Sequence, residues 1–139
     1  MKISTAILCD FAEVRDNLPF VVAGGVTRLF RAEWPGPMNV CLAMMVELDR
    51  TERETPHELD VQVIDEDGHP VARIQGAFQQ GAGPDVDFHE ITFFPFTFDL
   101  RQVGILHVGW HSIEISIDSK PHHTLRFRTG TPPAPAPLE

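Results

Sequence analysis

Residues 38–48 read MNVCLAMMVEL, and this stretch decides the fold class. Its even-numbered positions are all large and apolar, whereas its odd-numbered positions include an asparagine, a glutamate and two small residues. Successive side chains of a β-strand point to opposite faces of the sheet. The alternation therefore predicts a strand with one face in a hydrophobic core.

The next segment, residues 57–78, predicts a β-hairpin. Two alternating runs flank Asp-Glu-Asp-Gly at 65–68, which is typical of a tight turn. Placing Val63 opposite Ala72 matches apolar with apolar positions along both strands, so this register is expected. The paired aspartates do not indicate a calcium loop, because the chain leads directly into the next strand instead of supplying further oxygen ligands.

Residues 109–129 predict another hairpin, for which two registers compete. One register sets Ile113 opposite Arg126 and so mixes apolar and charged side chains on one face. Shifting the pairing by one residue sets Ile115 opposite Leu125 and separates the faces. We expect the shifted register.

Two further segments predict extended structure. Residues 18–31 are apolar but are interrupted by Gly24-Gly25, which is typical of a bulge or of a close approach between backbones. Residues 88–100 are rich in phenylalanine and contain Pro95, which cannot donate a ladder hydrogen bond. The second segment is therefore expected at a sheet edge or at a break in a strand.

Short strands at this spacing predict an all-β fold, namely an antiparallel β-sandwich of roughly seven or eight strands, immunoglobulin-like or jelly-roll-like. We assign residues 1–129 to this single domain. Residues 130–139 are proline-rich and lack a core-forming pattern, so they predict a disordered tail.

Composition limits the partners that can be expected. The formal net charge of −9 and the absence of a Lys/Arg cluster disfavour nucleic acid. Apolar runs fall short of the ~20 residues of a membrane span, so no membrane is expected as partner.

The first residues, MKISTAILCDF, resemble a strand more than an export signal, because the apolar run is short and Leu8 precedes the cysteine where lipid attachment requires a small residue. We therefore expect a cytoplasmic protein in which Cys9 and Cys41 are free thiols.

Three stretches, CDFAEVRDNLPFVVAGGVTRL at 9–29, VQVIDEDG at 61–68 and GWHSIEISID at 109–118, resemble a family of small uncharacterised bacterial proteins. The resemblance extends from Ala6 to Phe127 and concerns mainly strands and turns. It implies a bacterial β-sandwich. The family has no assigned activity, so the resemblance implies no functional residues.

The sequence places no catalytic residues, metal site or cofactor. The seven histidines are scattered over different predicted strands and turns, and His111 continues an apolar stripe, as a core histidine would. No nucleophile stands near a base. Trp34, in a turn, is a possible platform for a sugar ligand. A small-ligand domain for carbohydrate or metal, or an enzyme of unknown reaction, remains the alternative.

The segment FHEITFFPFTFDL, residues 88–100, carries more aromatic residues than one face of one strand needs. Either both of its faces are buried, or part of it is kept for another chain. The candidate partner-binding edge consists of Phe88, Ile91, Phe93, Phe94, Pro95 and Phe96. The sequence thus favours a non-enzymatic protein-binding or assembly module that docks a protein partner or associates with itself.

Overall fold

The computed structural model describes residues 1–81, 83, 85–134 and 137 of the chain. This part of the chain is nearly all β, as predicted, with one short helix and more and shorter strands than expected. The elements are β1 (Lys2–Cys9), β2 (Phe11–Arg15), β3 (Leu18–Val22), β4 (Arg28–Phe30), β5 (Gly36–Pro37), β6 (Cys41–Leu48), α1 (Arg50–Arg53), β7 (His57–Asp65), β8 (Pro70–Phe78), β9 (Thr92–Asp99), β10 (Gly104–Ile105), β11 (Gly109–Ile117) and β12 (Lys120–Gly130).

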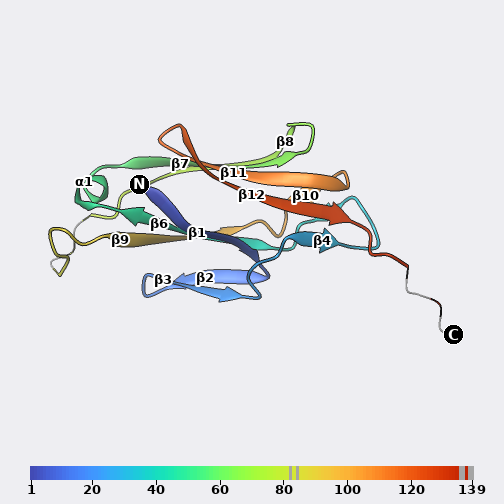
Figure 1. Ribbon diagram of the computed structural model, residues 1–139, viewed down its shortest axis with the longest axis horizontal. Helices are drawn as coiled ribbons and strands as arrows, with labels where there is room; N and C mark the ends of the chain where they lie inside the picture. The colour runs from blue at the N-terminus through green and yellow to red at the C-terminus, as the bar shows by residue number, and fades with distance from the viewer. Residues whose placement is uncertain (82, 84, 135–136, 138–139) are drawn as a thin grey trace.

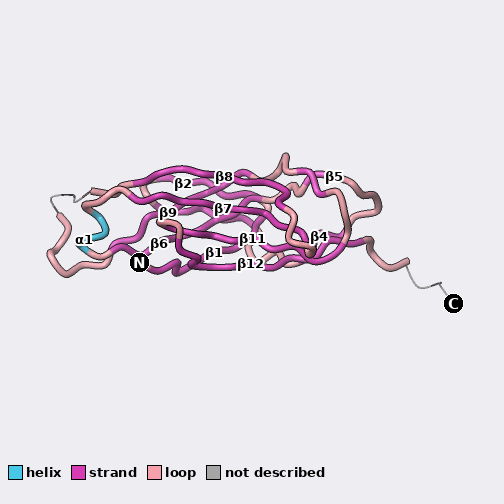
Figure 2. Tube along the Cα trace, turned by 90° about the horizontal axis from the view of Figure 1, so that it is seen from above, coloured by secondary structure: helices cyan, strands magenta, loops and turns pink. Residues whose placement is uncertain are grey.

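The strands are arranged in layers (Figure 1). A five-stranded sheet of order β4-β12-β11-β7-β8 lies over a three-stranded sheet of order β1-β6-β9, and the β2–β3 hairpin lies beyond the latter. Pairing is antiparallel except between β4 and β12, which run parallel. Seen from above, the strands follow the long axis, with α1 at one end and β5 at the other (Figure 2).

The main core lies between the five-stranded and three-stranded sheets. The predicted apolar face of residues 38–48 is confirmed, because all six even-numbered side chains are buried there. They meet buried side chains of the opposite sheet, which include Leu59, Val61, Val63, Ile113, Ile115, Ile117 and Phe127.

On the other face of β6, Cys41 and Ala43 are also buried and Met45 and Glu47 are half-buried, which the alternation did not predict. Cys41 and Ala43 form a small second core with Cys9 and Ala12. Ala12 lies on β2, so the β2–β3 hairpin covers this side. Both cysteines are free, and the Cys9 Sγ donates to the Cys41 carbonyl at 3.5 Å. Burial raises the pKa of the Cys9 thiol.

The two long hairpins differ in how well their registers were predicted. Val63 lies opposite Ala72, as expected. The expected register of the last hairpin is wrong, because Ile115 lies opposite His123 and Leu125 lies opposite Ile113.

The error in the last hairpin comes from its turn. Asp118 and Ser119 make a two-residue turn with φ of 52° and 63°, both left-handed. This turn is tighter than the predicted one and is followed by a bulge between Ile115 and Ser116, so that from Ile115 to Gly109 the pairing is displaced by two residues. A shift of two preserves the faces, so the isoleucine stripe is still buried.

The segment 18–31 is divided where the glycines indicated. β3 ends at Val22 and β4 begins at Arg28. A Cβ at Gly24 would lie 2.7 Å from the Ile7 Cδ1 and 3.1 Å from the Val21 Cγ1, so these side chains would have to shift if Gly24 were replaced.

Residues 131–134 and 137 of the predicted tail form no helix or strand, and residues 135, 136, 138 and 139 lie outside the described part. Within the described residues, no helix has the length and apolar character needed to cross a membrane.

Candidate functional site

β9, which contains most of the predicted partner-binding edge, is an edge strand of its sheet and pairs with β6. Phe94 and Phe96 point toward the main core, where their rings lie 5.2 Å and 5.0 Å from the ring of Phe78. Pro95 is buried on the opposite face, across from Met45. These three candidate residues therefore contribute to the interior.

The other three candidate residues are exposed. Phe88, Ile91 and Phe93 each expose between 41% and 58% of their surface. Phe88 and Ile91 lie in the loop between β8 and β9, and Phe93 lies at the start of β9. The exposed part of the predicted edge is thus its N-terminal part. The described residues of the loop surround these exposed side chains.

The backbone edge of β9 is partly occupied beside these residues. The Gln80 Nε2 donates to the carbonyl of Phe93 at 3.1 Å. Pro95, two residues further on, has no N–H to offer. The first half of β9 is therefore poorly suited to pairing with an added strand, and the side chains rather than the backbone are available for contact.

Arg53 holds the loop between β8 and β9 in place. It is 2% exposed, its carbonyl accepts from the Gly81 N–H at 3.0 Å, and its guanidinium donates to the Glu90 carbonyl. One residue therefore fastens both ends of the loop. The sequence analysis missed this role, although Asp49 and Glu52 match a helix capping box that places Arg53 in a short helix.

Arg50, also on α1, fixes one of the exposed aromatic side chains. Its guanidinium carbon lies 3.7 Å from the centre of the Phe88 ring. A cation over an aromatic face stabilises the ring position. Phe88 is therefore exposed but in contact with α1.

The β2–β3 hairpin presents a second group of exposed apolar residues. Ala12 faces the small core, so the alternate positions face outward. These outward residues are Phe11, Leu18, Phe20 and Val22, together with the ion pair of Glu13 and Arg15. The Arg15 guanidinium lies 5.5 Å from the centre of the Phe20 ring.

A groove of about 510 Å³ lies where one residue of the hairpin group meets two residues of the β9 group. Leu18 lines it from the hairpin, Met45 from β6, and Ile91 and Phe93 from the β9 side. We define the apolar surface as Leu18, Phe20, Val22, Ile91 and Phe93. It is built from two segments that lie far apart in the chain.

Comparison with known proteins places the chain in a family. The model of a family of unknown function (DUF6941) matches residues 4–129. The chain belongs to this family. The description of the family assigns no function, so membership confirms the resemblance to an uncharacterised family and adds no site residues. No curated protein matches the chain.

Trp34, the possible ligand platform, is half-buried in this member of the family. Its indole N–H donates to the Gly130 carbonyl at 2.9 Å, and its ring packs against the main core. The Arg31 guanidinium lies 5.4 Å from the ring centre. The polar atom of the indole is therefore used inside the protein.

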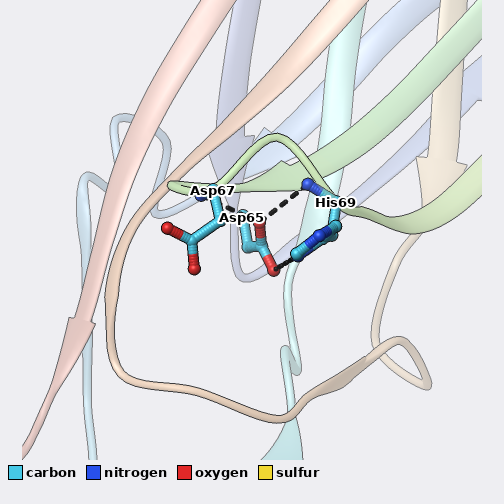
Figure 3. Close-up of side chains that lie close together, drawn as sticks. All are labelled: Asp65, Asp67 and His69. Atoms are coloured by element: carbon cyan, nitrogen blue, oxygen red, sulfur yellow. Dashed lines mark hydrogen bonds and ion pairs between the residues drawn. The ribbon is translucent and has the colours of Figure 1, made fainter.

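The turn between β7 and β8 brings together the residues that could hold a cation (Figure 3). Ligand atoms of Asp65, Asp67 and His69 lie within 4.8 Å of one another. The Asp65 Oδ1 accepts from the backbone N–H of His69 at 2.8 Å and of Asp67 at 3.0 Å. These hydrogen bonds lower the pKa of Asp65 and explain why the sequence favours a turn here.

Proposed function

We propose that this protein is a non-enzymatic assembly module that binds a second copy of itself through the apolar surface. The observation that carries the proposal is that Leu18 of the hairpin meets Ile91 and Phe93 around one groove, while Phe20 and Val22 are exposed on the same hairpin. Exposed apolar patches of this kind are typical of interaction sites. The backbone that frames the groove is fastened by Arg53 and Gln80, so little backbone order has to be gained on binding.

A second copy is favoured as the partner by the local charge. The chain carries a formal net charge of −9, which opposes association through most faces. The hairpin face contains Glu13 and Arg15 as a pair and is therefore neutral. In a two-fold symmetric dimer, Glu13 of each copy can face Arg15 of the other.

We infer that the fold is a β-sandwich supplemented by a hairpin layer. The five-stranded and three-stranded sheets that share the main core support this description. The two buried free thiols support a reducing compartment such as the cytoplasm.

Light scattering across a range of concentrations tests the assembly. The molar mass of the wild type is expected to rise from 15.6 kDa toward twice this value. Phe20→Glu and Phe93→Glu place a charge in the contact and are expected to hold the protein at the monomer mass.

The matched control is Trp110→Glu. Trp110 is 52% exposed and lies on β11, away from the apolar surface. This variant should associate like the wild type. A wild type that stays monomeric at the highest concentration would contradict the proposal, and so would equal disruption by all three variants.

A further inference from the structure

A second cavity, of about 290 Å³, lies between the turn that joins β7 to β8 and the segment from β10 to β11, and none of its lining residues belongs to α1 or to the apolar surface. Its lining includes Asp65, His69, Gly104, Leu106, His107 and His111. Three of the seven histidines of the chain therefore face one cavity together with a carboxylate.

The pairing of the strands explains why these residues meet. Asp65 ends β7 and lies directly opposite His111 of β11. The turn after β7 supplies His69, and the segment between β10 and β11 supplies His107. These residues lie on different strands and turns that are far apart in the sequence, so no local motif indicates that they meet.

His111 is a buried residue that lines the cavity. It is 4% exposed, and its ring stacks on Phe127 at 5.2 Å. The Nδ1 lies 3.2 Å from the Gly109 carbonyl, which can only accept, so Nδ1 carries the hydrogen. The Nε2 then holds the lone pair and has no hydrogen-bond partner among the described residues. Metal-binding histidines are commonly oriented by such a bond from the other ring nitrogen.

Asp65 and His69 have nearly the spacing of two ligands on one metal ion. The turn uses Oδ1 of Asp65, whereas Oδ2 lies 3.6 Å from Nδ1 of His69 (Figure 3). This separation is too long for a hydrogen bond. Two ligand atoms at ~2.0–2.1 Å from a tetrahedral Zn²⁺ are ~3.3 Å apart.

We propose that Asp65, His69, His107 and His111 bind a divalent transition-metal ion of the zinc class. Three imidazoles and one carboxylate are a ligand set suited to such ions. Among the described residues, no three of these four have ligand atoms within 4.8 Å of one another, so the exposed rings of His69 and His107 turn toward the ion when it binds. The carboxylate of Glu66 lies beside Gly109 and adds negative charge, since a Cβ at Gly109 would be 2.8 Å from its Oε1.

The direct test is calorimetric titration of ZnCl₂ into chelator-treated protein without a histidine tag. One Zn²⁺ per chain is expected to bind. His69→Gln and His107→Gln each remove a ligand from an exposed position and should weaken the affinity at least ~10-fold. His89→Gln, an exposed histidine on the loop between β8 and β9, is the matched control and should bind like the wild type.

Thermal unfolding gives a second measurement that does not depend on binding heat. Zn²⁺ should raise the melting temperature of the wild type and of His89→Gln, but not that of the His69→Gln/His107→Gln double variant. Absence of Zn²⁺ binding to the wild type overturns the proposal. Unchanged affinity in the double variant also overturns it.

A variant of Asp67 distinguishes the proposed four-residue site from a simpler site formed by the turn alone. The Asp67 carboxylate has an oxygen within 4.8 Å of the ligand atoms of Asp65 and His69, but Figure 3 shows it turned away from that pair, and it is not one of the four proposed ligands. Asp67→Asn should therefore leave Zn²⁺ affinity unchanged. If Asp67→Asn removes binding while His107→Gln does not, the ion belongs to the turn and the four-residue site is wrong.

Discussion

The five-stranded sheet and the β2–β3 hairpin cover opposite faces of the same three-stranded sheet, but they bury very different side chains. Against the five-stranded sheet, β6 places large residues such as Leu42 and Met44. Against the hairpin, it places Cys41 and Ala43. The hairpin then exposes Phe20 and its apolar neighbours on its outer side.

This difference shows that the hairpin is held by close approach rather than by a large core. Burial of apolar surface contributes ~25 cal/mol per Å², so small residues contribute little. Gly24 permits contact with Ile7, which brings the chain near the sheet. A two-stranded hairpin is marginal by itself, and its outer apolar face is the part that a second copy would cover.

The largest expected effect is on the large-residue side of β6. Leu42→Ala removes a fully buried side chain from the main core and should lower the free energy of unfolding by ~3 kcal/mol, because it leaves a cavity. Cys41→Ala, at the next position on the small-residue side, removes one sulfur and should cost ~1 kcal/mol. Urea denaturation measures both. Equal losses would show that the two faces do not differ as described.

A smaller effect is expected at the end of the five-stranded sheet. The His57 Nδ1 lies 2.7 Å from the Asp118 Oδ2, and its Nε2 lies 2.7 Å from the Glu52 carbonyl. Both partners accept, so the protonated ring suits this position. Burial lowers the pKa of His57, but these hydrogen bonds outweigh burial and the pKa is raised above 6.5.

The sign of the pH dependence follows from these shifts. The contribution of His57 is complete below pH 6.5 and is lost as the pH rises through the raised pKa. Backbone and side-chain hydrogen bonds lower the pKa of Asp118, so its contribution is lost as the pH falls through that value. Asp118→Asn should lower the free energy of unfolding by ~1 kcal/mol at pH 6 and by less at pH 9. The expected loss is small because Asp118 is half-exposed.

The matched control is Asp60→Asn, which removes an exposed ion pair to Arg73 and involves no histidine. Its effect should be the same at pH 6 and pH 9, as followed by urea denaturation. A pH-independent loss in Asp118→Asn would refute the role of His57.

The sequence could predict those features that depend on neighbours along the chain. The alternation in residues 38–48 placed Leu42 correctly, and the Asp-Gly turn placed Val63 opposite Ala72. The alternation could not predict which element covers Cys41, because the covering hairpin comes from another part of the chain.

The same reason explains the remaining errors. The tight turn at Asp118 contains no glycine, and its carboxylate is held by the Glu58 N–H, 60 residues away in the chain. The convergence of His107 and His111 with Asp65 likewise depends on the pairing of β7 with β11. Local patterns determine which face of a strand is apolar, whereas contacts between distant strands determine what covers it.

The smallest effect on the monomer is expected on the outer side of the hairpin. Phe20 is 49% exposed and lies opposite Glu13, and its main contact is with the Arg15 guanidinium. Phe20→Ser should therefore change the free energy of unfolding of the monomer by only ~0.5 kcal/mol. Association stabilises the folded state, so the melting temperature of the wild type should rise with protein concentration, whereas that of Phe20→Ser should not. At low protein concentration, Phe20→Ser could instead lower the free energy of unfolding as much as Leu42→Ala does. The Phe20 ring would then belong to a packed interior, and the hairpin would not differ from the five-stranded sheet as described.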